Sequence, residues 1–306
     1  MAAQAAPRPA TAARVLAEAM PYLREYHGKV LVVRFGGRAM TDPALMEAFA
    51  RDVALLRLVG MKLIVVHGGG WRIDELMQKV GLTPRREDGY RVTDAEVLNV
   101  VEMALDELNQ ELTGFINRHG GRAVGINGQD GRFIRARRMT TPGGADLGFV
   151  GDVAGIDVEL VHLLLSREFV PVIMPIGVGD DGTAYHINSD LLAGRLARAL
   201  KAEKLVLMTN VPGIAGADGR LAYILRASEA EALVRDRRID PEMAPRVQAA
   251  LEAVREGVRS VHIIDGGVRD ALLLEVLTAD GVGTAIRSDE GPHFLEDSRA
   301  YLLASG

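Results

Sequence analysis

VLVVRFGG at residues 30–37 and LIVVHGGG at residues 63–70 decide the fold of this chain. Each is a short, β-branched apolar run that ends on consecutive glycines, and each precedes a stretch with helical periodicity. Consecutive glycines let backbone N–H groups converge on an anion, and the N-terminus of the following helix adds its dipole. Two such turns in one small unit indicate that two anionic groups are held close together, as moving a phosphoryl group from a nucleotide to a carboxylate requires.

The rest of the chain continues this alternation of strands and helices. We expect helices over 12–27, 43–59, 71–80, 96–120, 158–169, 189–200, 228–239, 246–257 and 270–281. We expect strands at 30–35, 62–67, 122–127 and 170–179, within 204–214 and 260–267, and at 283–289, with a hairpin or two within 132–152. Repeated βαβ units predict an open αβα sandwich, a mainly parallel central sheet of about eight strands with helices on both faces.

Bulk composition narrows the function classes. The net charge of −5 argues against a nucleic-acid partner, and the absence of cysteine excludes disulfides, thiolate catalysis and cysteine metal sites. No apolar run approaches the roughly 20 residues that span a bilayer, so no membrane partner is expected. The first 13 residues, rich in alanine and proline, are expected to be a frayed tail rather than a transit peptide, which favours a cytoplasmic protein.

Each glycine turn taken alone is typical of plain turn chemistry, and neither the G-x-G-x-x-G fingerprint nor a P-loop is present. The ordered set of motifs is more specific: R-F-G-G-R-A-M (34–40), V-H-G-G-G (66–70), D-E-L-M (74–77), R-V-T-D (91–94), G-I-N-G-Q-D-G (125–131), D-L-G-F-V-G-D-V (146–153), H-I-N-S-D (186–190), T-N-V-P-G-I (209–214) and D-A-L-L-L-E-V-L-T (270–278). This set resembles the N-acetylglutamate kinases of the amino-acid kinase family, over nearly the whole chain from about residue 12.

The resemblance implies an activity and a division of the chain. The activity is transfer of the γ-phosphoryl group of ATP to the side-chain carboxylate of N-acetyl-L-glutamate, a step of arginine biosynthesis. Mg²⁺ would arrive with ATP, and no metal site of the protein's own is expected. After a tail and helix at 1–27, a lobe at 28–200 would bind the acyl-amino acid and a lobe at 201–306 would bind ATP.

The resemblance also implies a role for individual residues. The substrate-binding residues would be Gly69, Gly70, Arg91, His186 and Asn188, with the two glycines at the phosphoryl acceptor and Arg91 at the α-carboxylate. The phosphate- or ATP-binding residues would be Gly36, Gly37, Asn210 and Gly213. The catalytic residues would be Arg34, Asp190 and Arg246, with Asp190 orienting the two basic groups. Simpler interpretations are a surface ion pair for Arg91 and a helix N-cap for Asp190.

Several of these positions depart from the family pattern. Arginine replaces lysine at both Arg34 and Arg246, which are the positions expected to contact the transferring phosphoryl group. The other departures are Arg38 for asparagine, Trp71 for proline with Arg72 beside it, His186 for asparagine, and Asn210 for aspartate. Lysine is rare in this chain, which favours simple drift toward arginine, but arginine is longer and planar.

Three interpretations follow from these departures. The chain is an acylglutamate kinase with drifted residues, a kinase for another acidic acyl-amino acid with a pocket reshaped by Trp71, Arg72 and His186, or a catalytically impaired paralogue that acts as a ligand-binding or regulatory subunit. The segment 16–29 resembles the N-terminal extension of arginine-regulated hexameric members. A homodimer is expected, with a hexamer through this helix as the alternative, and Asp270 stands where a histidine of the arginine-regulated pattern is usual.

Overall fold

The computed structural model describes residues 9–290, except 88, 142, 217, 241, 242 and 280. The first eight positions of the expected tail, and everything after residue 290, lie outside the described residues. The helices are α1 (Pro9–Tyr26), α2 (Pro43–Leu58), α3 (Gly70–Lys79), α4 (Ala95–Arg118), α5 (Glu159–Ser166), α6 (Ser189–Ala199), α7 (Ala227–Arg235), α8 (Ala244–Arg255) and α9 (Ala271–Leu277).

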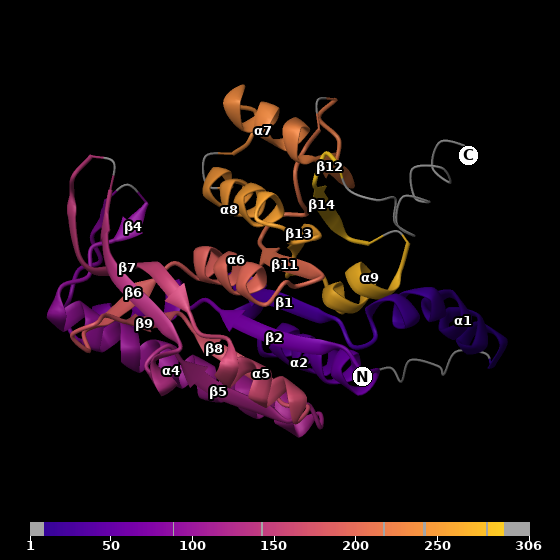
Figure 1. The fold of residues 1–306 in the computed structure, drawn as a ribbon, viewed down its shortest axis with the longest axis horizontal. Helices are drawn as coiled ribbons and strands as arrows, with labels where there is room; N and C mark the ends of the chain where they lie inside the picture. Colours follow the sequence, from indigo (N-terminus) through magenta and orange to yellow (C-terminus); the bar gives the residue numbers. More distant parts are fainter. Residues whose placement is uncertain are drawn as a thin grey trace.

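Eight strands form one open sheet, which confirms the predicted architecture (Figure 1). They are β1 (Val30–Phe35), β2 (Lys62–His67), β5 (Ala123–Asn127), β8 (Val170–Met174), β11 (Lys204–Thr209), β12 (Ile224–Arg226), β13 (Ser260–Asp265) and β14 (Gly283–Arg287). Their order is β12-β14-β13-β11-β1-β2-β8-β5, and only β13 and β14 run antiparallel. The two glycine-terminated strands β1 and β2 are therefore central neighbours, with Phe35 opposite His67.

Alternate residues of the central strands pack on opposite faces of this sheet, as the two-residue period of a strand requires. Val32 and Ile64 contribute to a core that also contains side chains of α5, α6, α7 and α8. Leu31 and Val33 contribute to the other core, which contains side chains of α1, α2, α4 and α9. The strands are apolar on both sides because helices cover both faces.

Six further strands lie outside the main sheet. The strands β6 (Ile134–Thr140), β7 (Asp146–Ile156), β9 (Ile176–Val178) and β10 (Ala184–Ile187) form a small sheet that closes on itself, and β3 (Arg86–Glu87) pairs with β4 (Tyr90–Arg91). The prediction of one strand over 170–179 was wrong, because the chain leaves the main sheet at Pro175 and continues as β9 in the small sheet. A proline has no N–H to donate to a ladder, so it is a natural break between the two strands.

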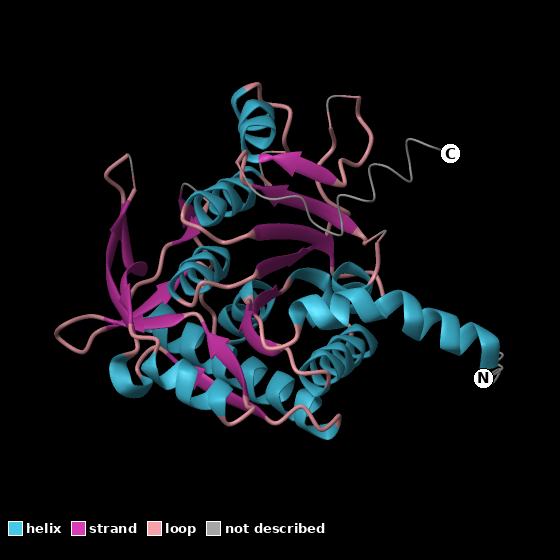
Figure 2. Cartoon of the chain, turned by 45° about the vertical axis from the view of Figure 1, so that its right-hand side comes forward, coloured by secondary structure: helices cyan, strands magenta, loops and turns pink. Residues whose placement is uncertain are grey.

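Helix α1 extends away from the sheet, and only its C-terminal part is built into the core (Figure 2). Tyr22 and Tyr26 are buried, whereas the apolar side chains of Val15, Leu16 and Met20 are exposed. None of the described helices, α1 included, combines the length and apolar content that crossing a membrane needs.

Candidate active site

The turn after β2 is held in place by a buried histidine. His67 Nε2 lies 3.1 Å from Asn109 Nδ2, which can only donate, so the ring N–H is on Nδ1 and donates to the Gly68 carbonyl at 2.7 Å. Burial, opposed by that hydrogen bond, lowers the pKa of His67 to about 4, so the ring is neutral at neutral pH. An uncharged side chain, His67, therefore holds the second glycine turn through the carbonyl of Gly68.

The turn after β1 is packed tightly against two polar side chains. A Cβ at Gly36 would lie 2.2 Å from Arg34 Nη1, and a Cβ at Gly37, where φ is +75°, would lie 2.2 Å from Asn210 Oδ1. The same Asn210 oxygen accepts a hydrogen bond from the Arg38 backbone N–H at 2.7 Å. A larger residue at Gly36 would displace the Arg34 guanidinium, and glycine is favoured at Gly37 by its positive φ as well as by close approach. Asn210 links this turn to the end of β11.

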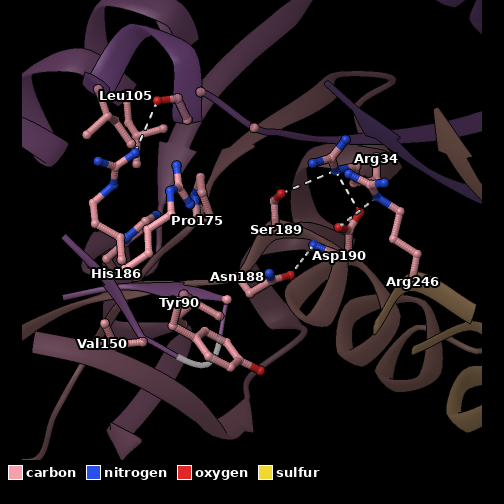
Figure 3. A pocket seen from close by; sticks show the side chains of 18 residues that line it. Arg34, Tyr90, Leu105, Val150, Pro175, His186, Asn188, Ser189, Asp190 and Arg246 are labelled. Atoms are coloured by element: carbon pink, nitrogen blue, oxygen red, sulfur yellow. Dashed lines mark hydrogen bonds and ion pairs between the residues drawn. The ribbon is translucent and has the colours of Figure 1, made fainter. Parts of the chain in front are cut away.

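Arg34, Asp190 and Arg246 converge on one point from three different elements (Figure 3). Arg34 Nε lies 2.8 Å from Asp190 Oδ1, and Arg246 Nε lies 3.5 Å from Asp190 Oδ2. Burial lowers the pKa of Arg34, Asp190 opposes this, and Arg246 adds to it, but a guanidinium keeps its charge in proteins. One carboxylate thus holds two positive charges side by side.

Helix α6 presents this carboxylate from its first turn. The interpretation of Asp190 as the N-cap was wrong, because Asn188 is the N-cap. The Asn188 side-chain oxygen accepts from the N–H groups of Asp190 at 2.9 Å and Leu191 at 3.1 Å. The cap satisfies the free helical N–H groups, and the Asp190 side chain remains available for the two arginines.

Arg91 is buried at the opposite end of the site. Its Nη1 pairs with Asp74 Oδ1 and also lies 3.3 Å from Met77 Sδ, while Nη2 donates to the Gly70 carbonyl at 3.2 Å. Asp74 is shared with Arg86, whose Nη2 lies 3.1 Å away. Arg91 is therefore a buried group tied to the second glycine turn, not a surface arginine in an ordinary ion pair.

His186 lies beside these arginines on β10. Burial, together with the positive charges of Arg91 and Arg86, lowers the pKa of His186 to about 4. The imidazole is therefore neutral at neutral pH and offers one N–H donor and one nitrogen acceptor. A neutral hydrogen-bonding group at this point is chemically closer to an asparagine than a charged histidine would be.

These groups surround one cavity of about 290 Å³. Its walls include every residue predicted as catalytic or substrate-binding: Arg34, Gly69, Gly70, Arg91, His186, Asn188, Asp190 and Arg246. Arg34 and Arg246 lie at one end, and His186, Tyr90 and Val150 lie toward the other (Figure 3). Four arginines line the cavity against one aspartate, so its surroundings favour an anionic occupant.

The predicted phosphate- and ATP-binding residues are placed differently. Gly36, Gly37, Asn210 and Gly213 are not among the residues that line the cavity. The first turn nevertheless borders it through Arg34, since Gly36 touches that guanidinium. Gly213, where φ is +145°, packs against the Thr284 hydroxyl, which accepts the Ile214 N–H at 2.8 Å. A role for these residues in binding ATP stays a prediction.

Other lining residues were not singled out from the sequence. They include Gly68, Arg86, Tyr90 and Ser189, and Asp74 lies behind Arg91. Gly68, Asp74 and Ser189 belong to motifs used for the resemblance, so the signal was present but was not given a role. Arg86 and Tyr90 belong to the short hairpin β3–β4. Strands of two residues are too short to show an alternating pattern in the sequence.

Two substituted positions, Trp71 and Arg72, lie outside the cavity. Arg72 binds Glu107 with Nε at 3.0 Å and Glu75 with Nη1 at 2.7 Å, and Trp71 is 37% exposed. Neither is among the cavity-lining residues. Of the three substitutions expected to reshape the pocket, only His186 therefore lines it.

Comparison with known proteins identifies the family of the chain. The model of the amino acid kinase family matches residues 29–265. The chain belongs to the amino-acid kinase family. Among curated members, an acetylglutamate kinase from Chromobacterium violaceum is 54% identical, covering 90% of this chain and 97% of the relative, and one from Nitrosomonas eutropha is 51% identical, covering 90% and 96%.

Solved structures of other family members share the fold. The N-acetylglutamate synthase of Neisseria gonorrhoeae, solved with coenzyme A and N-acetylglutamate, has a TM-score of 0.83 at 28% identity over 90% of this chain. The match spans only 63% of the synthase chain. The carbamate kinase of Giardia lamblia bound to AMP-PNP, at 17% identity and a TM-score of 0.62, covers 86% of this chain and 99% of its own, and supports the fold alone.

Proposed function

We propose that this family member phosphorylates the side-chain carboxylate of N-acetyl-L-glutamate with ATP, as the names of its most similar relatives suggest. The observation that carries the proposal is the pair of arginines held on Asp190 beside the glycine turns. A transferring phosphoryl group spreads negative charge over its oxygens, and fixed positive charges stabilise that charge without reorganisation. Arg34 and Arg246 would supply these fixed positive charges from two sides of the phosphoryl group.

The shape of the cavity fits a substrate with two carboxylates. Arg91 is the buried charge at the far end and would pair with the α-carboxylate, with its plane already set by Asp74 and Gly70. The N–H groups of Gly69 and Gly70 would hold the side-chain carboxylate at the start of α3. His186 and Asn188 lie along the cavity wall and would offer neutral hydrogen bonds between the two ends.

Arginine in place of both lysines is compatible with turnover in this arrangement. Both side chains reach Asp190, so the two positive charges are retained at the place where the reaction would need them. The longer Arg34 is accommodated because Gly36 and Gly68 leave space for its guanidinium. We therefore favour an active kinase over a binding-only paralogue. Trp71 and Arg72 lie outside the cavity, so of the three substitutions only His186 still supports a different acyl-amino acid.

Cofactor and assembly complete the proposal. In the described part of the chain, no group of three or more His, Cys, Asp or Glu side chains could hold a metal ion, and Asp190 already balances two arginines. Mg²⁺ would therefore be carried on the phosphate oxygens of ATP. We further propose that the protein is a cytoplasmic homodimer. The alternative assembly is a hexamer, in which the exposed apolar residues of α1 would form the contact between dimers.

The test is a coupled assay of ADP release by the purified protein with MgATP and a panel of N-acyl glutamates, aspartates and aminoadipates. We expect turnover with N-acetyl-L-glutamate at the highest kcat/KM of the panel. A higher kcat/KM for another member would contradict the proposed substrate. Ligand-induced thermal stabilisation without ADP release would instead support a binding-only subunit.

A further inference from the structure

Arg34 has two oxygen atoms near its Nε atom, and they differ in kind. Asp190 Oδ1 is the nearer, at 2.8 Å, and Ser189 Oγ lies at 3.2 Å. Only Ser189 takes the hydrogen bond: Asp190 Oδ1 is buried and accepts no hydrogen bond from the described residues. The Nε–H bond therefore points at the Ser189 hydroxyl and away from the nearer carboxylate oxygen.

Asp190 therefore supplies the electrostatic attraction for Arg34, and Ser189 supplies the directional hydrogen bond. A carboxylate attracts a guanidinium from any side, whereas a hydrogen bond weakens steeply when its angle closes. Arg34 makes one other directional contact, from Nη1 to the Met208 carbonyl at 3.1 Å on β11. Because the guanidinium is planar, two hydrogen bonds from different nitrogens fix its orientation completely.

The fixed orientation leaves one edge of the guanidinium for a ligand. Nη2 has no partner among the described residues, and a Cβ at Gly68 would lie 3.3 Å from it. Gly68 lines the cavity at the second glycine turn. We propose that Ser189 is a positioning residue: its hydroxyl turns the Arg34 guanidinium so that Nη2 faces the transferring phosphoryl group. This inference rests on the proposed kinase activity.

Loss of the hydroxyl has a defined consequence. Without Ser189 Oγ, the Nε–H bond can rotate toward Asp190, and the Nη2 edge then moves away from the second turn. Small misplacements of a catalytic group can cost up to about 100-fold in rate. We expect Ser189→Ala to lower kcat about 10-fold or more while the KM for ATP changes less than three-fold, and Ser189→Thr, which keeps a hydroxyl, to recover most of the rate.

A double-mutant cycle isolates the contact. A lysine has no Nε–H group that Ser189 could direct in this way, so in an Arg34→Lys protein the added Ser189→Ala change should alter kcat by less than about two-fold. The matched control is Ser166→Ala at the exposed end of α5, which should match wild type. Equal losses in both Arg34 backgrounds, or no loss in the single variant, would overturn the proposal.

A second readout does not depend on turnover. The Arg34 Nε–H resonance, identified by its disappearance in Arg34→Lys, should be visible in wild type and Ser189→Thr, and should shift or broaden in Ser189→Ala. An unchanged resonance in Ser189→Ala would overturn the positioning role. Absence of ADP release by wild type would instead reject the proposed function, and the resonance would still decide whether Ser189 directs Arg34.

Discussion

Asp190 is a buried carboxylate whose two oxygens face two different arginines. Arginine and lysine carry the same charge, but arginine places it on a plane that must be oriented. Burial raises the importance of that orientation, since few water molecules can reorganise around Arg34. The proposed activity therefore depends on the orientation of these two arginines.

Removing the Arg34 charge should abolish most of the activity. We expect Arg34→Ala to lower kcat by about 10²–10³-fold, because one preorganised charge at the transferring group is lost. Arg34→Lys/Arg246→Lys should change kcat only modestly, since both charges remain. The measurement is ADP release under saturating substrates, with Arg14→Ala on the exposed part of α1 as the control. An Arg34→Ala protein with wild-type kcat would refute the role of Arg34.

His186 should leave a signature in the pH dependence of stability. Its pKa is about 4 in the folded protein and about 6.5 when unfolded, so the unfolded state binds the proton first as pH falls. The associated stability is present above pH 6.5 and is lost between about pH 6.5 and 4, an effect of roughly 1–3 kcal/mol.

His186→Asn should remove that part of the pH dependence. Its Tm should therefore fall less steeply than that of wild type as the buffer moves from pH 7.5 to 4.5. His67 keeps its own lowered pKa in both proteins, so some acid sensitivity remains. His162→Asn on the exposed side of α5 is the control, and it should run parallel to wild type. Parallel curves for His186→Asn would contradict the lowered pKa.

At the scale of elements, the two helices after the second glycine turn, α3 and α4, are joined by an arginine that lies outside the cavity. Arg72 of α3 binds Glu107 of α4 and Glu75 of its own helix, and these contacts raise the pKa of Arg72. Arg72 and its two glutamates form an ion-pair network on the surface between α3 and α4, and exposed ion pairs of this kind contribute little to stability.

Arg72→Ala should therefore leave substrate recognition unchanged. We expect the KM for N-acetyl-L-glutamate to stay within about two-fold of wild type, because Arg72 is paired outside the cavity. Asp74 is only two positions after Arg72 in the chain, but it pairs with Arg91. Asp74→Ala should therefore raise that KM, since Arg91 loses its partner. A large KM change in Arg72→Ala would revive the interpretation of a reshaped pocket.

At the scale of the whole molecule, one sheet runs through both proposed lobes, and the lobes also meet through α2 and α9. Asp52 of α2 is buried, and its carboxyl group interacts with the backbone of Leu272 and Leu273 of α9. Burial, followed by the negative charge of Asp270, raises the pKa of Asp52 to about 7. The junction between the proposed lobes therefore contains a carboxyl group that is partly protonated at neutral pH.

Asp52 should make the folded protein less stable as pH rises. Its folded pKa lies above its unfolded value of about 3.9, so its favourable contribution is present at low pH and is lost as pH rises through 7. The Tm of Asp52→Asn relative to wild type should therefore increase from pH 5 to pH 8. The exposed Asp180→Asn variant serves as control. A Tm difference that does not vary with pH would show that Asp52 titrates normally.

The central parallel strands and the residue types of the site could be predicted from the sequence, because strand periodicity and glycine turns are local properties of the chain. The motif set contains Arg34 and Asp190, and the family resemblance implied a role beside them for Arg246. Local pattern could not separate β8 from β9, because both are apolar and the break depends on which sheet each strand joins.

Which group each side chain faces could not be predicted from local sequence pattern, because it depends on packing between distant elements. Asn188 rather than Asp190 caps α6, and Arg72 turns outward while His186 turns inward. Ser189 meets Arg34 across 155 positions of sequence, and such a contact depends on hydrogen-bond direction in three dimensions. The chemistry of the site could be read from residue types, but its orientation is set by packing between elements that are distant in the chain.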